Sequence, residues 1–371
     1  MATGLGYASQ MGAIRETVFG TGVTAPLDRI PFLSETLVDT VKQIESNALL
    51  GTPGRTNSYL GSVPVQGQVV SELRYTNKSS TYFCGSDLLI AMAMHTQPHA
   101  TLTQWALAAN YNTLRLYNDC DKFFTLGIGK GVSVWNFISC FISKMTIEGG
   151  ADENIKCTFE ITARNINKAD SPITLANLNS IAAVSGRAVT FLDGVLRLGT
   201  GAAALTTTHR IGIKKWKLEL DNKLSDPDFT TFDSATTPAS STNKMTILPV
   251  RNGMREVTME IELARYETTV GQAMEGYYTA GTPVQADFIF TGLDTDLATA
   301  ATYKFSLPHL KVTECKSNIG GAEYFPQSIK LRAFRGASWT PAFPLKLIDA
   351  STAIVDEFAV EFDTERTAQL Y

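Results

Sequence analysis

The sequence has little charge and few of the residues from which catalytic and metal sites are usually built. Only 18% of its 371 residues are charged, against about 25% in a typical soluble domain. Hydrophobic residues make up 44%, which is enough for a large core and excludes a disordered chain. The formal net charge of −4 argues against a basic nucleic-acid-binding protein. The low charge density suggests a surface that is partly covered by further copies of the same chain.

The five cysteines have no spacing that is typical of a metal site or a disulfide framework. No CxxC pair occurs among Cys84, Cys120, Cys140, Cys157 and Cys315. We expect reduced and mostly buried thiols in a protein that is made and assembled in a cytoplasm. The N-terminal segment has no basic region followed by an apolar one, so we expect no secretory signal. The longest apolar run, Leu88–Met94, is far shorter than the roughly 20 residues of a membrane helix. We therefore expect no membrane insertion.

Motifs for catalysis, cofactors and metals are missing as well. His95 and His99 are four residues apart, but Pro98 interrupts the helix that would put them on one face. The segment Gly127–Gly131 lacks the GxxxxGK[ST] pattern of a phosphate loop, so we interpret it as a hairpin turn. The aspartates at 221, 226, 228 and 233 lack the glycine of a calcium loop. We predict no catalytic residue, no cofactor and no metal site.

Alternating polar and apolar residues predict an all-β fold with a few short helices. In Arg255–Tyr266 the acidic residues Glu256, Glu260 and Glu262 face one way and apolar residues the other. Lys156–Arg164 and Lys215–Asp221 have the same period of two. Short helices are predicted at Ser86–His95 and Thr268–Tyr278 and, from a weaker pattern, at Thr101–Ala109.

Turn residues divide the strands. The Asp193-Gly194 pair between two apolar runs predicts a two-residue β-hairpin. The segment Asp226–Asn243 is rich in Ser, Thr, Asp and Pro, which predicts a long exposed loop.

The order of these elements occurs twice, which suggests an internal duplication. Ser143–Glu148 is similar to Leu310–Glu314, and a Gly-Gly pair follows each segment. The predicted organisation is a first domain with an N-terminal arm at 1–165, a linker with the β-hairpin at 166–208, a second domain at 209–336 and a C-terminal arm at 337–371. The arm has a plausible strand at Ala353–Asp363. Two unrelated antiparallel β-domains are the alternative.

Several segments, in this order, resemble a known family. They are IRETVFGTG at Ile14–Gly22, IPFLSETL at Ile30–Leu37, GSVPVQGQVVSEL at Gly61–Leu73 and IGIKKWKLELDNKL at Ile211–Leu224. The pattern is similar to the tail tube proteins of long-tailed bacteriophages with non-contractile tails. The similarity spans roughly residues 12 to 336, and neither the C-terminal arm nor the loop Asp226–Asn243 takes part in it.

The resemblance implies a virion structural protein without enzymatic activity. Each tube domain is expected to be a β-sandwich or barrel-like unit whose inner sheet joins its neighbours in a ring. Rings of the same chain stack into a hollow tube through which the phage DNA passes without specific binding. Two domains in one chain favour a trimeric ring over a hexameric one. Other tail proteins, such as the tape measure and the terminator, are the expected partners, and assembly is expected in the host cytoplasm.

The resemblance also gives roles to two groups of residues. Acidic side chains on the wet strand faces are expected to line the channel and repel phosphate: Glu72, Glu160, Glu219, Glu256, Glu260 and Glu262. Long loops and the C-terminal arm are expected to join one ring to the next through Thr52, Arg55, Asp226, Asp228, Phe229, Asp233, Phe358 and Phe362. Ordinary wet faces on an outer surface and ordinary surface loops are the respective alternatives.

Two other functions fit the sequence less well. A tail terminator or a head decoration protein would form closed rings without long tubes. A carbohydrate-binding or hydrolytic β-protein would need clustered exposed aromatic residues, but the tryptophans are scattered along the chain at 105, 135, 216 and 339.

Overall fold

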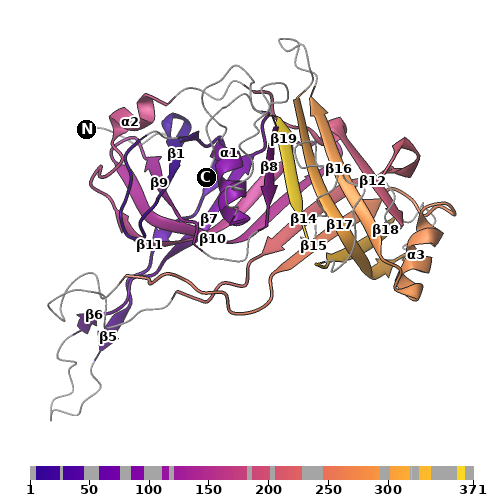
Figure 1. Ribbon diagram of the computed structural model, residues 1–371. Helices are drawn as coiled ribbons and strands as arrows, with labels where there is room; N and C mark the ends of the chain where they lie inside the picture. Colours follow the sequence, from indigo (N-terminus) through magenta and orange to yellow (C-terminus); the bar gives the residue numbers. More distant parts are fainter. Residues whose placement is uncertain are drawn as a thin grey trace.

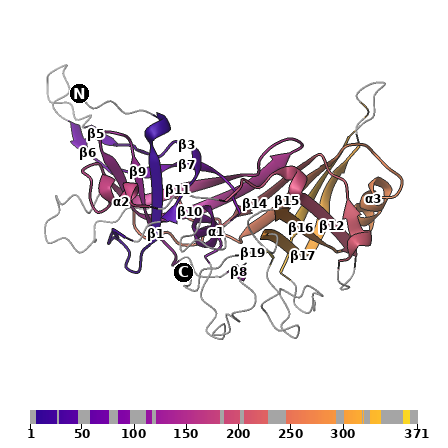
Figure 2. The ribbon, with the colours of Figure 1, turned by 90° about the horizontal axis from the view of Figure 1, so that it is seen from above.

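The structure of the chain is a computed structural model (Figure 1). The described residues are 6–25, 28–45, 58–75, 85–95, 111–116, 121–181, 186–200, 205–227, 245–292, 301–317, 319, 326–335 and 357–363. Strands dominate, and the helices are few and short, as predicted. In Figure 2 the two halves lie end to end, with α2 near one end and α3 near the other.

The elements follow one another in this order: β1 (Gln10–Arg15), β2 (Asp28–Arg29), β3 (Phe32–Glu35), β4 (Val38–Asp39), β5 (Gln43–Glu45), β6 (Ser58–Leu60), β7 (Val65–Glu72), α1 (Gly85–Ala93), β8 (Tyr111–Arg115), β9 (Phe124–Gly129), β10 (Val134–Gly150), β11 (Lys156–Asn167), α2 (Leu175–Asn179), β12 (Gly194–Thr200), β13 (Arg210–Ile211), β14 (Lys215–Asp221), β15 (Glu256–Leu263), α3 (Gly271–Ala280), β16 (Val284–Gly292), β17 (Ala301–Lys316), β18 (Gln327–Ala333) and β19 (Ala359–Asp363). Single 3₁₀ turns lie at Gly6–Ala8, Phe191–Asp193 and Thr207–His209. No helix in the described ranges is long and apolar enough to cross a membrane.

One antiparallel sheet runs through both halves of the chain. Its strands are hydrogen-bonded in the order β7, β11, β10, β14, β15, β18 and β17. The two halves meet where Lys144–Gly150 of β10 pairs with Lys215–Asp221 of β14. The predicted alternation is confirmed in β15, in which every second residue is buried. The sheet therefore has one dry face toward the core and one wet face.

The strand pairings of the first half recur in the second half. β7 pairs with β11, β11 with β10, β10 with β9 and β9 with β1. In the same way β15 pairs with β18, β18 with β17, β17 with β16 and β16 with β12. A short helix follows β7 in one half and β15 in the other. β17 continues through Pro308 as one strand.

Aromatic side chains fill the core of the second half. Trp216, on the dry face of β14, packs edge-on against Phe288 with ring centroids 4.6 Å apart. Phe290 and Phe305 complete the cluster, and all four residues are at most 1% exposed. Full burial of such side chains contributes about 1.5–3 kcal/mol each. The burial of Trp216 agrees with the alternation predicted for Lys215–Asp221.

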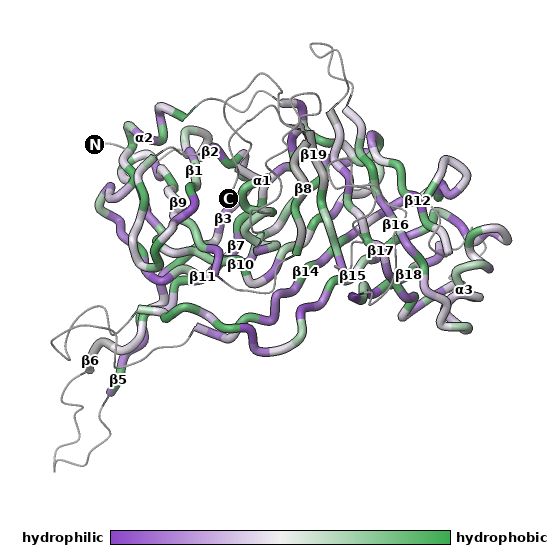
Figure 3. Tube along the Cα trace, in the orientation of Figure 1, coloured by the Kyte–Doolittle hydropathy of each residue, from purple (hydrophilic) through white to green (hydrophobic). Residues whose placement is uncertain are grey.

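The two predicted helices that fall in described ranges are confirmed. All nine residues of α1 are buried, and the helix is hydrophobic from Leu88 to Ala93 (Figure 3). The second half covers α1, because Tyr303 donates a hydrogen bond to Asp87 and Asn222 donates one to the Ala93 carbonyl. α3 is more exposed and has only Gly271 and Met274 buried. The weaker helix prediction at Thr101–Ala109 lies outside the described residues.

The predicted hairpin at Asp193-Gly194 is wrong. Asp193 ends a 3₁₀ turn, where its carboxylate accepts hydrogen bonds from the Thr190 amide and from Arg187. The strand that follows, β12, pairs with β16 and β13 and not with the preceding segment. The side-chain bonds of Asp193 thus stabilise a local turn in place of the two-residue hairpin turn.

Candidate functional site

The wet face of the continuous sheet brings together all six acidic residues that sequence analysis assigned to a channel lining. We call this surface the polar sheet face and define it by the outward positions of β7, β11, β10, β14, β15 and β18. Directly opposed residues in adjacent antiparallel strands point to the same face. The strand registers therefore place on it Glu72, Glu160, Glu219, Glu256, Glu260 and Glu262.

Basic residues lie between these acidic residues across the sheet. One row of directly opposed residues reads Glu72, Lys156, Glu148, Lys217, Glu260 and Lys330 across six strands. A parallel row places Lys144 between Glu160 and Asp221, with Glu256 next to Asp221. Charges of opposite sign thus alternate over most of this surface.

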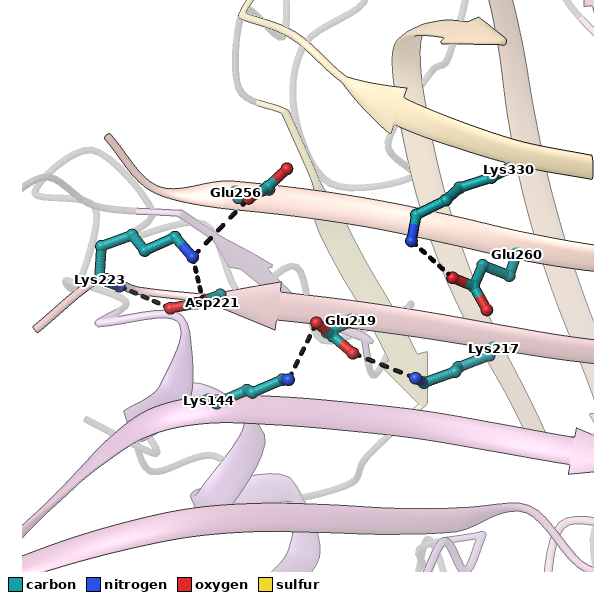
Figure 4. Close-up of polar contacts among 8 residues, drawn as sticks. All are labelled: Lys144, Lys217, Glu219, Asp221, Lys223, Glu256, Glu260 and Lys330. Carbon is teal, nitrogen blue, oxygen red and sulfur yellow. Dashed lines mark hydrogen bonds and ion pairs between the residues drawn. The ribbon is translucent and has the colours of Figure 1, made fainter. Parts of the chain in front are cut away.

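Glu219 lies near the centre of the polar sheet face and bridges two lysines (Figure 4). Its carboxylate oxygens lie 3.0 Å from the ammonium nitrogen of Lys144 on β10 and 3.1 Å from that of Lys217 on its own strand. Burial raises the pKa of Glu219, but the hydrogen bonds from the two lysines outweigh this and hold its pKa below its ordinary value. The bond to Glu219 raises the pKa of Lys144. Both groups are therefore charged at neutral pH.

The other carboxylates of β15 also have basic partners. Lys330 on β18 lies 2.8 Å from Glu260, and this hydrogen bond raises the pKa of Lys330. Glu256 lies 3.4 Å from Arg332 and 3.7 Å from Lys223, which also contacts Asp221 (Figure 4). Partly exposed pairs of this kind contribute only about 0–1 kcal/mol each to stability. Their main effect is on the charge of the surface.

The expectation of an acidic lining needs correction. The predicted glutamates do share one face, but neighbouring lysines and arginines neutralise most of their charge. Sequence analysis missed the partners on β10 and β18, namely Lys144, Lys330 and Arg332. Their alternation with apolar residues could have shown the wet face, but not which strands lie side by side. The resulting surface is strongly polar and close to neutral.

Most of the residues expected to join rings are not among those that the structure describes. Thr52, Arg55, Asp228, Phe229 and Asp233 lie outside the described residues. Asp226 is exposed after the end of β14, and its predicted role between rings stays a prediction.

Phe358 and Phe362 belong to a part of the C-terminal arm that pairs within the chain. β19 lies between β17 and β8 and so connects the two halves. Phe358 is fully buried and stacks on Phe305, with ring centroids 6.3 Å apart. Phe362 lies opposite Tyr303 and Asn112 in the two pairings. The assignment of Phe358 to an inter-ring contact is therefore wrong, because its ring packs inside its own chain.

The described residues do not form a metal-ligating group of three or more His, Cys, Asp or Glu side chains. Cys140 and Cys157 are buried, and Cys315 is half-buried. Gly129 ends β9 and Val134 begins β10, which confirms the predicted hairpin in place of a phosphate loop.

A comparison with protein families agrees with this geometry. The family model described as "Phage tail tube protein" matches residues 6–333. The chain belongs to the phage tail tube protein family. This tail tube protein is thus a component of the virion tail, and its membership favours a structural role. No curated protein matches the sequence.

Proposed function

We propose that this tail tube protein is the structural subunit of the tube and assembles with copies of itself into stacked rings. The rings form a hollow channel for the genome, and the polar sheet face lines that channel. Family membership supports the tube, and the continuous two-faced sheet supports the lining. The other face of the sheet is covered by the core, so only the polar sheet face is open to solvent.

The observation that carries the proposal is the junction between β10 and β14. It joins the two halves of the chain into one sheet, with seven consecutive cross-strand pairs from Lys144–Asp221 to Gly150–Lys215. A sheet that already continues from one unit to the next needs only repetition to close into a ring. Closure removes the open edges that otherwise promote uncontrolled aggregation.

We further propose that the chain carries two tandem tube domains and that three chains form a ring with six similar units. The recurrence of the strand pairings in the two halves supports this number. The domain limits expected from the sequence are 1–165 and 209–336, joined by residues 166–208. The strand β12 in this linker pairs with β16 of the second half, which suggests that the second unit begins before residue 209.

A polar, nearly neutral lining suits the passage of DNA. Nonspecific affinity for DNA comes mainly from lysine and arginine contacts to phosphate. On the polar sheet face the carboxylate partners of Lys144, Lys217 and Lys330 compete for these cations. DNA would therefore slide past this surface with little attraction.

Stacking of rings is assigned to the segments that project from the sheet. β5 and β6 form a two-stranded hairpin that extends away from the first half (Figure 1). In the sequence, Thr52 and Arg55 lie between β5 and β6, and Asp228, Phe229 and Asp233 follow Asp226. The tape measure and the terminator are the proposed partners inside and at the end of the tube.

Negative-stain electron microscopy of the purified protein over a concentration series tests the proposal. Hollow tubes or stacked rings are expected at high concentration. Single closed rings at every concentration would point to a terminator or a head decoration protein. Monomers at every concentration, even with purified tail-tip complexes added as nuclei, would reject self-assembly into a tube.

A further inference from the structure

We propose that the end of β17 in one copy pairs antiparallel with β4 of a second copy, with Lys316 opposite Val38. This inference rests on the proposed ring and specifies which edges meet and in which register. It is derived from the β10–β14 junction inside the chain, which serves as a template for the junction between chains.

Two β-bulges align β10 with β17 residue by residue. β10 has one extra residue, Ser143, in its pairing with β11, and β17 has one extra residue, Thr313, in its pairing with β18. The hydroxyl of Ser143 donates a hydrogen bond to the Glu160 carbonyl at 3.3 Å, and that of Thr313 donates one to the Lys330 carbonyl at 3.1 Å. A second irregularity, between Phe137 and Cys140, corresponds to one between residues 307 and 310. Residues of β10 thus correspond to those 170 positions later.

β3 and β4 occupy, in the first half, the place that β14 occupies in the second. Gln68 of β7 lies opposite Glu160, as Glu260 of β15 lies opposite Lys330. With these positions matched, Glu35 and Val38 correspond to Trp216 and Glu219. The preceding strands agree with this match. Gly12 pairs with Arg29 between β1 and β2, and Arg197 pairs with Arg210 between β12 and β13, so Arg29 corresponds to Arg210 with the same offset as Val38 to Glu219.

The junction between two copies is expected to have the same register as the β10–β14 junction inside the chain. Thr146 lies opposite Glu219 in the β10–β14 pair. The corresponding residues are Lys316 and Val38. The junction begins with a hydrogen bond of 2.9 Å from the Asn222 amide to the Ser143 carbonyl. Its counterpart between copies runs from the Val41 amide to the Thr313 carbonyl.

The hydrogen bonds already made by the β4 edge agree with this register. The amides of Thr36 and Thr40 donate to carbonyls of Gln68 and Pro64, on the β7 side. In an extended strand the amides of odd-numbered residues then point to the opposite edge. The carried-over register uses Val41 and Asp39 at that edge. The amide of Leu37 already binds the Glu35 carboxylate at 3.0 Å, so pairing is expected along β4 and not along β3.

Both edges have the character of an interface. In the described part of the chain, residues 311–316 of β17 pair with β18 alone, whereas the matching part of β10 pairs with both β11 and β14. At the other edge Val38 is 52% exposed and Val41 is 47% exposed. Exposed strand edges usually carry charges or proline that discourage pairing. Two exposed valines on such an edge indicate that it is covered in the assembly.

The exposure of α3 supports the same partner. α1, which lies on β10, is fully buried because the second half covers it. α3 lies on β17 in the corresponding place, but Tyr278 is 49% exposed. A second copy that docks its β4 edge on β17 would cover α3 as the second half covers α1.

A disulfide cross-link tests the register. The doubly substituted V38C/K316C protein is assembled under reducing conditions and then oxidised with diamide. Thr146 and Glu219 form a non-hydrogen-bonded pair, and such pairs have Cα atoms about 4.5 Å apart, within disulfide range. Covalent dimers and trimers are expected on non-reducing gels. The single variants V38C and K316C measure the background from the native cysteines.

Two matched variants define the controls. T146C/E219C places the same pair at the internal junction and should form a disulfide within one chain. V38C/E314C shifts the register by two residues to a diagonal separation of about 7–8 Å and should cross-link much more slowly. Rings in the microscope without a V38C/K316C cross-link, or with faster V38C/E314C cross-linking, would overturn the register. Absence of rings for the unmodified protein would instead reject the proposed function, and this inference with it.

Discussion

The ring of Phe358 lies nearly parallel to that of Phe305, at an interplanar angle of 4°. The residue before it, Glu357, accepts a hydrogen bond of 2.7 Å from Arg255, whose side chain is 7% exposed. A buried aromatic stack next to an ion pair fixes the start of β19. At this point the C-terminal arm is a part of the core.

Replacement of this side chain tests that role. Phe358→Ala should lower the free energy of unfolding by about 3–5 kcal/mol, because it removes a buried ring and leaves a cavity. Chemical denaturation of the free subunit measures the change. Phe334→Ala is the control, because Phe334 is 38% exposed; its cost should be below about 1 kcal/mol. Equal effects of the two changes would contradict a core position for Phe358.

His95 gives the subunit a predictable dependence on pH. Burial, together with the nearby charge of Arg251, lowers the pKa of His95 to about 4. In the unfolded chain the imidazole takes up a proton below about pH 6.5, whereas in the folded chain it remains neutral until about pH 4. The free energy of unfolding should therefore decrease as the pH falls from 7 to 4.

His95→Asn isolates this contribution. Asparagine tolerates the φ of +51° at this position. Between pH 7 and pH 4.5 the unmodified protein should lose about 1–3 kcal/mol more stability than the variant. Denaturant titrations at the two pH values measure the difference. If both proteins lose the same stability, the histidine is not held neutral in the folded state.

At the scale of the elements, β10 and β17 determine the architecture. Each is long and bends at its irregularities, so that one part pairs with β9 or β16 and the other part with the continuous sheet. The part of β10 in the continuous sheet contributes to the polar sheet face, on which the charges alternate. Matched substitutions can separate the sign of these charges from the loss of the ion pairs.

We expect E219Q/E260Q tubes to retain DNA and K144Q/K330Q tubes not to do so. Both variants break the Lys144–Glu219 and Lys330–Glu260 pairs, but they change the charge of the face in opposite directions. Freed lysines bind phosphate, and this binding weakens as salt is added. Fluorescence anisotropy of labelled DNA injected into assembled tubes at two salt concentrations measures retention. Equal behaviour of the two variants would place the polar sheet face outside the channel.

Strands with strict alternation were predictable, whereas irregular segments were not. The periods of β14 and β15 appeared directly in the sequence. Local similarity in the sequence aligned Lys144 of the first half with Lys311 of the second half. The bulges at Ser143 and Thr313 show that the residue equivalent to Lys144 is Glu314. A bulge inserts one residue into a strand, and a gapless comparison of two segments does not take this residue into account. The turn at Asp193 was missed because bonds of its own side chain decide its geometry.

For the whole molecule, the candidate site was predictable in part. Each glutamate of the polar sheet face was identified by the alternation within its own strand. Its neutralising partners are contributed by strands far away in the sequence, as with Glu260 and Lys330. Only the strand order shows that these charges face each other. The family resemblance did not contain this information, because it concerns the arrangement of segments and not their ion pairs.

The continuous sheet also explains the low charge of the chain. Each end of the sheet is an edge that fits a further copy, and the β4 edge carries the exposed apolar residues Val38 and Val41. Residues that become buried on assembly do not need charge to stay soluble.

The central claim is that three chains, each with two similar units, close one ring. Native mass spectrometry of dissociated rings, combined with rotational averaging of end-on electron micrographs, tests it most directly. The account predicts a ring with the mass of three 40.3-kDa chains and six lobes around an open centre. A ring of six chains, or one with three lobes, would contradict it, because the two halves would then not occupy equivalent positions around the channel.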